Sequence, residues 1–180
     1  VYYRAHDNKR LLRFDPEAGE LTHHGLLDKN GHLNAMAVQR GLLYGALYGG
    51  GVLYEYDVNR PWADRDEEDP NPRDLGQGNP HIGRPHALLA HPDGRHLIMG
   101  GTPGYGLTGG GLFIYDLEER SGVVLSEDDL LPEHSTNCLV ALPDGNLVGG
   151  TTTMPGTGGE TLAEEAELYV FDFAERKVAW

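Results

Sequence analysis

The chain contains four copies of one strand-like segment, Leu-x-x-aromatic-Asp, and this repetition limits the folds that it can adopt. The copies cover residues 11–15, 53–57, 112–116 and 168–172. In each copy a Leu lies four residues before the Asp, and a Phe or Tyr lies directly before it. Because side chains alternate across a β-strand, each face of such a strand carries an apolar residue at a fixed level. The pattern predicts strands that are buried on both faces.

A second set of segments repeats in step with the first. The apolar runs 34–38, 86–90 and 137–141 each precede a short turn that contains Gly, and another apolar run follows each turn. Tight turns between short apolar runs predict β-hairpins. The following runs, 42–44, 96–99 and 147–148, end on the small residues Gly45-Ala46, Gly100-Gly101 and Gly149-Gly150. Outermost strands are expected at 20–24, around Leu75, at 123–125 and at 177–180, and Val1-Tyr2-Tyr3 is expected to be the second strand of an incomplete first unit.

The spacing of the units indicates the fold class. From one Asp to the next the distance is 42, 59 and 56 residues, which suits four short strands and their connections. We expect an all-β protein: a single partial β-propeller of about four blades of four-stranded antiparallel sheet, with the first blade incomplete. The blades correspond to residues of about 1–27, 28–80, 81–130 and 131–180. Open ends would leave apolar blade faces in water, so a larger ring is expected, completed by the missing part of a parent protein or by another copy of the chain.

Little helix is predicted outside this framework. Thr161 and Glu164 form the pattern of a capping box, which predicts one or two helical turns over 161–167. Residues 126–131 are expected to form another such turn. The acidic, proline-broken stretch 63–74 is expected to be an exposed loop.

Composition excludes several classes of partner. With 14 basic and 28 acidic residues the formal net charge is −14, so we expect no nucleic acid and no membrane as partner, because both surfaces need neutralising cations. The one cysteine, Cys138, allows neither an internal disulfide nor a multi-thiolate site. The glycine-rich segment 104–111 lacks the helix and Lys of a phosphate-binding loop. A histidine–metal site would need two or three imidazoles to converge, and His81, His86 and His134 could meet only through the fold. We expect no cofactor and no metal, and the compartment is left open.

The repeat resembles a known group of proteins. A double glycine after the second strand, an apolar-aromatic-Asp third strand and a Pro-Asp-Gly turn are similar to bacterial β-propeller repeats of the WD40-like, YVTN-like and Kelch-like kinds. The pairs Gly100-Gly101 with Tyr115-Asp116, and Gly149-Gly150 with Phe171-Asp172, look most like Kelch. The Kelch Trp is absent from the third unit and displaced to Trp180 in the fourth, and no Trp-Asp dipeptide occurs. The resemblance therefore implies the superfamily without a subfamily, and propellers include enzymes as well as scaffolds.

The resemblance also implies where a ligand would bind. In such propellers the connections between second and third strands, and those between blades, emerge on one face, and here they are long and polar. Convergent polar groups on long loops favour binding. Asn34, His86 and Asn137 occupy equivalent positions at the inner rim. The predicted ligand-binding residues are His86, Arg84, Tyr105, Asn34, Asn137 and His81, with His32 and His134 as further candidates.

Three functions are compatible with this pattern. The first is a binding or interaction module for a small molecule or glycan on the loop-rich face. The second is a carbohydrate-active enzyme, a polysaccharide lyase or hydrolase, in which His86 or Tyr105 acts as acid or base and Arg84 neutralises a uronate carboxylate. The third is a protein-interaction scaffold.

Overall fold

The computed structural model describes residues 2–5, 10–24 and 31–180, and these form four antiparallel sheets. The first sheet has three strands, β1 (Tyr2–Ala5), β2 (Arg10–Asp15) and β3 (Glu20–His24). The second has β4 (Leu33–Gln39), β5 (Leu42–Leu47), β6 (Val52–Tyr56) and β7 (Arg73–Gln77). The third has β8 (Arg84–Ala90), β9 (His96–Thr102), β10 (Leu112–Asp116) and β11 (Ser121–Leu125). The fourth has β12 (Ser135–Ala141), β13 (Leu147–Thr152), β14 (Leu168–Asp172) and β15 (Lys177–Val178).

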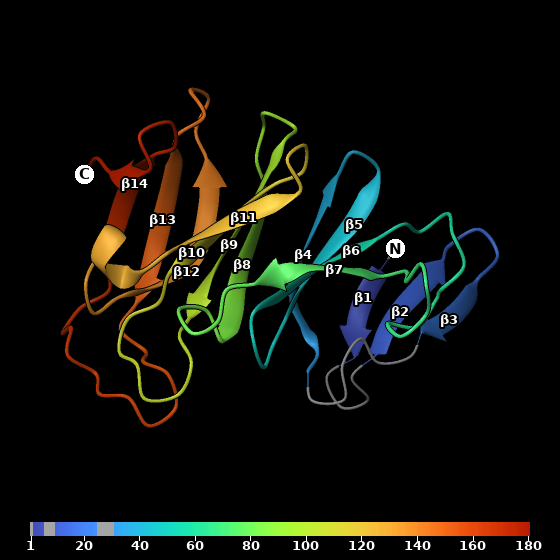
Figure 1. Cartoon of the computed structure of the whole chain (residues 1–180), viewed down its shortest axis with the longest axis horizontal. Helices are drawn as coiled ribbons and strands as arrows, with labels where there is room; N and C mark the ends of the chain where they lie inside the picture. Colours follow the sequence, from blue (N-terminus) through green and yellow to red (C-terminus); the bar gives the residue numbers. More distant parts are fainter. Residues whose placement is uncertain (1, 6–9, 25–30) are drawn as a thin grey trace.

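The predicted all-β repeat is confirmed. In every sheet the strands are hydrogen-bonded to their neighbours in chain order, and the four sheets follow one another along the molecule from the first to the last (Figure 1). The segment at residues 2–5 pairs with β2, as expected for the second strand of a blade that lacks its first strand. The strands at 42–47, 96–102 and 147–152 are longer than predicted, because they continue through the small residues at their ends.

The recurrent Asp closes the turn between the third and fourth strands of each blade. Its Oδ1 accepts a backbone N–H two or three residues further on, at 2.8 to 3.2 Å, in all four copies. An Asp side chain that bonds to its own turn in this way replaces a backbone turn contact. The residues concerned are Asp15, Asp57, Asp116 and Asp172.

The core lies between the sheets. One apolar cluster joins the first sheet to the second, another joins the second to the third, and the last joins the third to the fourth. The third of these contains Ile98 and Leu112 from one sheet, and Leu147, Tyr169 and Phe171 from the next. Face-to-face burial of alternate residues explains why the strands are apolar on both sides.

Each complete sheet has a β-bulge near the start of its innermost strand. The register shifts between Leu33 and Ala35 in β4, between Pro85 and Ala87 in β8, and between Thr136 and Cys138 in β12. The extra residue is Asn34, His86 or Asn137. A bulge leaves its extra residue unpaired and turns its side chain away from the regular alternation. A Cβ on Gly101, opposite the bulge in β8, would lie 2.2 Å from the carbonyl oxygen of Arg84.

The helical predictions had different outcomes. A short 3₁₀-helix, η1 (Glu127–Asp129), lies within the predicted 126–131 segment, and Ser126 and Asp129 form its capping box. The helix expected at 161–167 is absent, so that prediction is wrong. Leu162 is exposed there, and an isolated helical turn without a buried face does not offset the unfavourable free energy of its nucleation.

The acidic stretch 63–74 is largely exposed, as expected, and is anchored at its end. The side-chain amide of Asn71 is buried and donates to the carbonyl oxygens of Asp57, Arg60 and Pro61 at 2.9 to 3.3 Å. Its Oδ1 accepts the N–H of Asp57 at 3.0 Å. One buried amide therefore organises a loop that otherwise lies in solvent.

Candidate functional site

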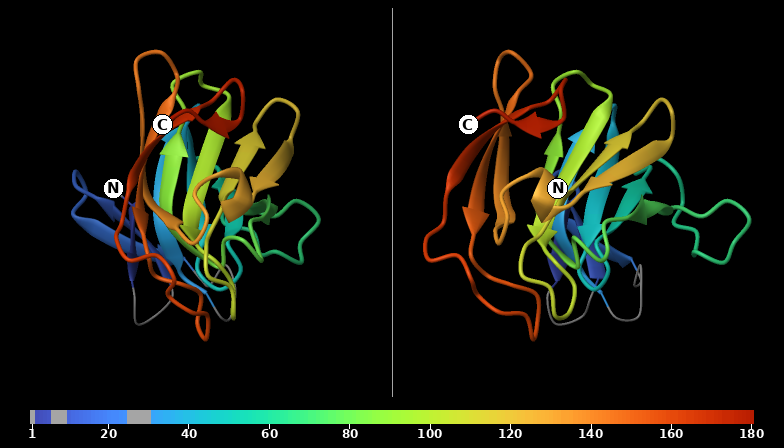
Figure 2. Two further views of the ribbon diagram at one scale, coloured as in Figure 1. Left: turned by 90° about the vertical axis from the view of Figure 1, so that its left-hand side faces the viewer. Right: turned by 60° about the vertical axis from the view of Figure 1, so that its left-hand side comes forward.

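Long connections gather at one end of the sheets and tight turns at the other. The loops between β9 and β10 and between β13 and β14 lie on the lower side in Figure 1 and in both views of Figure 2, and the hairpin turns lie on the upper side. The segment between β7 and β8 enters the same lower side. This is the arrangement that the sequence predicts for a loop-rich face.

Backbone hydrogen bonds fix these loops to one another. The N–H groups of Gly49 and Gly50 donate to the carbonyl oxygen of Gly83 at 3.1 and 3.2 Å. Gly104 donates to Pro80 at 2.7 Å, and Gly106 donates to Thr157 at 3.0 Å. The loops of three blades therefore form one hydrogen-bonded assembly.

Close backbone packing in this assembly requires glycine. A Cβ on Gly156 would lie 1.8 Å from the carbonyl oxygen of Gly104, far inside van der Waals contact. Gly110 and Gly111 serve the same close packing, since a Cβ on either would lie 2.1 Å from a carbonyl oxygen, whereas Gly106 has open space around it and a φ of +78°.

A cavity of about 400 Å³ opens between these loops. Its walls come from four segments: the β5–β6 connection, the β7–β8 connection with the start of β8, the β9–β10 loop and the β13–β14 loop. The lining residues are Tyr48, Gly49, Gly50, Asn79, Gly83, Arg84, Pro103, Gly104, Tyr105 and Thr157.

Arg84 supplies the positive charge of this cavity. Its guanidinium donates to the Thr157 hydroxyl and lies 5.4 Å from the centre of the Tyr48 ring. Within the described part of the chain, no Asp or Glu is in ion-pair distance of Arg84. In a protein of formal charge −14, a cation without a carboxylate partner in a cavity favours an anionic ligand.

Two tyrosines add aromatic surface. Tyr48 stacks on His32 with ring centres 5.2 Å apart and an interplanar angle of 10°. This contact, together with Arg84, holds the Tyr48 ring in place. Tyr105 is 83% exposed on the β9–β10 loop, so its ring is available to a ligand.

The structure separates the predicted site residues into two groups. Arg84 and Tyr105 line the cavity. Asn34, His86 and Asn137 are the bulge residues of three neighbouring inner strands and do not line it. They instead mark equivalent points on the inner rim.

His81 and the two further candidates support the loops. The carbonyl oxygen of His81 accepts the N–H of Gly111 at 2.9 Å. The ring of His134 contacts the carbonyl oxygens of Pro132 and Glu165 at 2.8 and 3.0 Å, and so connects two loops. His32 acts through its stacking on Tyr48.

Partial burial and the nearby charge of Arg84 hold the pKa of His86 below its ordinary value. The imidazole is therefore neutral at pH 7. Because His86 is absent from the cavity lining, the lyase-like combination of His86, Arg84 and Tyr105 does not share one cavity.

Sequence reasoning missed three residues of the cavity wall. Tyr48 lies in a connection that was singled out for its length, yet its ring was not selected. Asn79 and Thr157 come from connections 78 residues apart in the chain, and no local pattern predicts that they meet.

The described residues also contain one group of metal-ligating side chains, at the opposite end of β8 from the cavity. The ligand atoms of His91, Asp93 and His96 lie within 4.8 Å of one another. No metal was expected here from the sequence, because Pro92-Asp93-Gly94 was interpreted as a turn and the imidazoles weighed as a metal site were those of His81, His86 and His134.

Comparison with known proteins supports the fold. No protein-family model matches the chain, and no curated protein matches it. Among solved structures, hydrazine synthase of Kuenenia stuttgartiensis has a TM-score of 0.64 and 14% identity, over 96% of this chain and 42% of that one. The C-terminal WD40 domain of Sif2 has a TM-score of 0.57 and 13% identity, over 99% of this chain and 43% of that one.

At sequence identities of 13% and 14%, these two similarities show the fold alone. The chain spans about two fifths of the length of each of these two structures. In the described residues, no helix is long and apolar enough to cross a membrane. The repeated sheets, their common register and the two structural likenesses show that this chain has the blade architecture of a β-propeller fold.

Proposed function

We propose that the loop-face cavity binds an acidic glycan or a similar small molecule that combines a ring with a carboxylate. The observation that carries this proposal is the Arg84 guanidinium, which has no carboxylate partner among the described residues and lies between Tyr48 and Thr157. Arginine binds carboxylates in a two-pronged geometry. The rings of Tyr48 and Tyr105 offer flat apolar surfaces beside it, which suit a sugar ring.

Calorimetric titration tests this proposal with two probes of equal length, tetragalacturonate and a neutral maltotetraose. We expect tetragalacturonate to bind and maltotetraose to bind at least about tenfold more weakly, because the charge-assisted contact is missing. Arg84→Gln should remove that preference. Arg60→Gln is the matched control, because Arg60 lies on the β6–β7 connection and pairs with Asp69.

Equal affinity for the two probes would contradict the role of Arg84. A product released from tetragalacturonate during the titration would favour the enzyme alternative. His86→Ala should leave such a turnover unchanged, because His86 does not line the cavity.

A second function, self-association, rests on a different observation, which is the open face of the last sheet. Register places Cys138, Gly150 and Leu168 in one row across this sheet, and Val140, Val148 and Val170 in the next row on the same face. Leu168 is 63% exposed and Val140 is 56% exposed. A flat apolar sheet face of this kind marks an interaction surface.

The same face is covered in the preceding sheet. There the corresponding residues Ile98, Leu112 and Ile114 are buried by Tyr169 and Phe171 of the fourth sheet. At the other end of the chain, Phe14 occupies the position in the repeat that Phe171 occupies in the fourth sheet. Phe14 is 37% exposed.

We infer that the open face of the fourth sheet packs on the first sheet of a second copy. Phe14 and its cross-strand partner Leu21 are both exposed. The chain thus carries both halves of a blade-to-blade contact, one at each end, and head-to-tail contacts of this type close into rings.

Light scattering over a range of concentrations tests this inference. We expect about twice the chain mass of 19.7 kDa. Leu168→Asp should give the single-chain mass, whereas Leu162→Asp, which places the same charge on an exposed loop, should leave the dimer intact. A single-chain mass for the unaltered protein at every concentration would overturn the inference.

A further inference from the structure

The turn between β8 and β9 brings three potential metal ligands close together. The Oδ1 of Asp93 accepts the N–H groups of Arg95 and His96 at 2.8 and 3.0 Å, and so closes the turn. The Oδ2 of Asp93 lies 2.6 Å from Nδ1 of His96 and 2.9 Å from Nδ1 of His91. One carboxylate oxygen therefore shapes the backbone, and the other faces two imidazoles.

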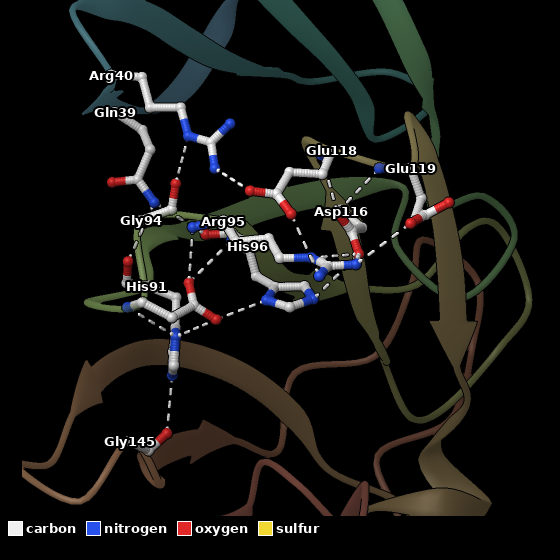
Figure 3. A network of polar contacts seen from close by, with 11 residues as sticks. Gln39, Arg40, His91, Gly94, Arg95, His96, Asp116, Glu118, Glu119 and Gly145 are labelled. Atoms are coloured by element: carbon white, nitrogen blue, oxygen red, sulfur yellow. Dashed lines mark hydrogen bonds and ion pairs between the residues drawn. The ribbon is translucent and has the colours of Figure 1, made fainter.

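The second nitrogen of each imidazole has a partner of its own. Nε2 of His91 lies 2.8 Å from the carbonyl oxygen of Gly145, and Nε2 of His96 lies 3.6 Å from Oδ2 of Asp116 (Figure 3). Metal-bound histidines commonly donate their other N–H to a carbonyl or a carboxylate, which fixes the ring and frees the facing lone pair. The ring of His91 has this arrangement, and the ring of His96 has a carboxylate near its second nitrogen, beyond hydrogen-bond distance.

His91 shows why a cation fits between these groups. Its Nδ1 accepts the N–H of Asp93 at 3.3 Å, so this nitrogen presents a lone pair. The same nitrogen lies 2.9 Å from the negative Oδ2 of Asp93. Two acceptors at that distance repel each other unless a proton or a metal ion lies between them.

The neighbouring blade shows that the turn itself does not need the histidines. In the turn between β12 and β13, Asp144 accepts the N–H of Asn146 at 3.0 Å and its side-chain amide at 3.1 Å. The two turns begin alike, since Gly94 donates to the carbonyl oxygen of His91 as Gly145 donates to that of Leu142. The turn between β8 and β9 is one residue longer, because His91 pairs with His96 whereas Leu142 pairs with Asn146. A Pro-Asp-Gly turn at this place in a blade therefore forms without either imidazole.

We propose that His91, Asp93 and His96 form a binding site for a divalent transition metal of the zinc type. Two imidazole nitrogens and one carboxylate oxygen form a three-ligand set that leaves one coordination position open. Zinc lies about 2.0–2.2 Å from such ligands, which corresponds to about 3.3 Å between ligand atoms in a tetrahedron. Side-chain movements of a few tenths of an ångström would suffice for the two contacts of Oδ2.

A second cavity, of about 400 Å³, lies beside this group, between the two hairpin turns. His91 and Asp93 line it on one side, and Asp144, Gly145 and Phe173 line it on the other. The ring of Phe173 stacks on His91 with centres 4.1 Å apart and limits the rotation of that ligand. Two of the three ligands are therefore reached from this cavity.

Titration of chelator-treated protein with Zn²⁺ tests the site. We expect one Zn²⁺ per chain with micromolar or tighter affinity, and a visible spectrum of tetrahedral type when Co²⁺ replaces zinc. His96→Asn should weaken binding by about tenfold or more with an unchanged circular dichroism spectrum. His91→Leu copies Leu142 of the neighbouring turn and provides a second variant.

His86→Ala is the matched control, because it removes an imidazole from the bulge in β8 and leaves the turn intact. It should not change the zinc affinity. Absence of binding at micromolar Zn²⁺, or binding that survives both His96→Asn and His91→Leu, would overturn the proposal.

Discussion

A buried hydroxyl pair in the fourth blade allows one prediction to be worked out in full. The ring of Tyr169 in β14 lies across β13 and brings its hydroxyl to 2.7 Å from Oγ1 of Thr136 in β12. The two residues are 1% and 3% exposed. This contact is possible because Gly149 lies beneath the ring, where a Cβ would be 2.2 Å from Cζ of Tyr169.

Breaking this pair from one side should be more harmful than removing it. Tyr169→Phe leaves the Thr136 hydroxyl buried without a partner, and Thr136→Val does the same to the Tyr169 hydroxyl. Each single variant should lower the free energy of unfolding by about 1–3 kcal/mol, the desolvation penalty of an unsatisfied group. The double variant replaces both partners with apolar groups of similar shape and should lie close to the unaltered protein.

Urea unfolding of the four proteins measures these effects. The midpoints and slopes give each free energy, and the double-mutant cycle gives the coupling. We expect the double variant to recover most of the loss of either single variant. Additive losses would refute the reasoning, because they would show that the two hydroxyls do not act as a buried pair.

Three further predictions concern Gly149, Tyr169 and His86. Gly149→Ala should lower the free energy of unfolding by about 1–3 kcal/mol through overpacking against Tyr169. In the control Gly94→Ala, the new Cβ meets nothing within 4 Å, so only the strain of its φ of +71° should lower stability; urea midpoints measure both variants. Burial raises the pKa of Tyr169 to about 12, so the contribution of this residue to folding stability is complete below the unfolded pKa of about 10. About 1.4 kcal/mol of the free energy of unfolding should be lost by pH 11. Tyr169→Phe should not show this loss. Because the pKa of His86 is lowered in the folded protein, the free energy of unfolding should decrease as the pH is lowered below about 6.5. An equal decrease in His86→Ala would contradict this.

Local physics explains what could be predicted from the sequence. The alternation of apolar residues and the turn-closing role of the Asp act over a few residues, so the strands and blades could be placed from the printed chain. The helix predicted at 161–167 is absent, because a local pattern does not determine whether a segment is buried. Its capping pattern is local, but its stability would require a buried face, and Leu162 remains in solvent.

The cavity could not be predicted because its parts are distant in the chain. Tyr48, Arg84 and Thr157 come from three blades, and their contact depends on how glycine-rich loops pack. The ligand set of His91, Asp93 and His96 was visible as a short motif, but a Pro-Asp-Gly turn explains the Asp alone. In the turn between β12 and β13, Leu142 takes the place of His91, so a Pro-Asp-Gly turn also forms without an imidazole.

That comparison suggests where chemistry lies in a repeat protein. Positions that agree between blades are explained by the strands, bulges and turns that they build, as the recurrent Asp and its N–H partners illustrate. Where the backbone is the same in every blade but the residue differs, the backbone structure does not explain the choice of residue. Arg84 corresponds to His32 in the second blade and Ser135 in the fourth, and His91 corresponds to Leu142. The third blade therefore carries both departures, one near each end of β8, and it is the blade on which binding experiments should concentrate.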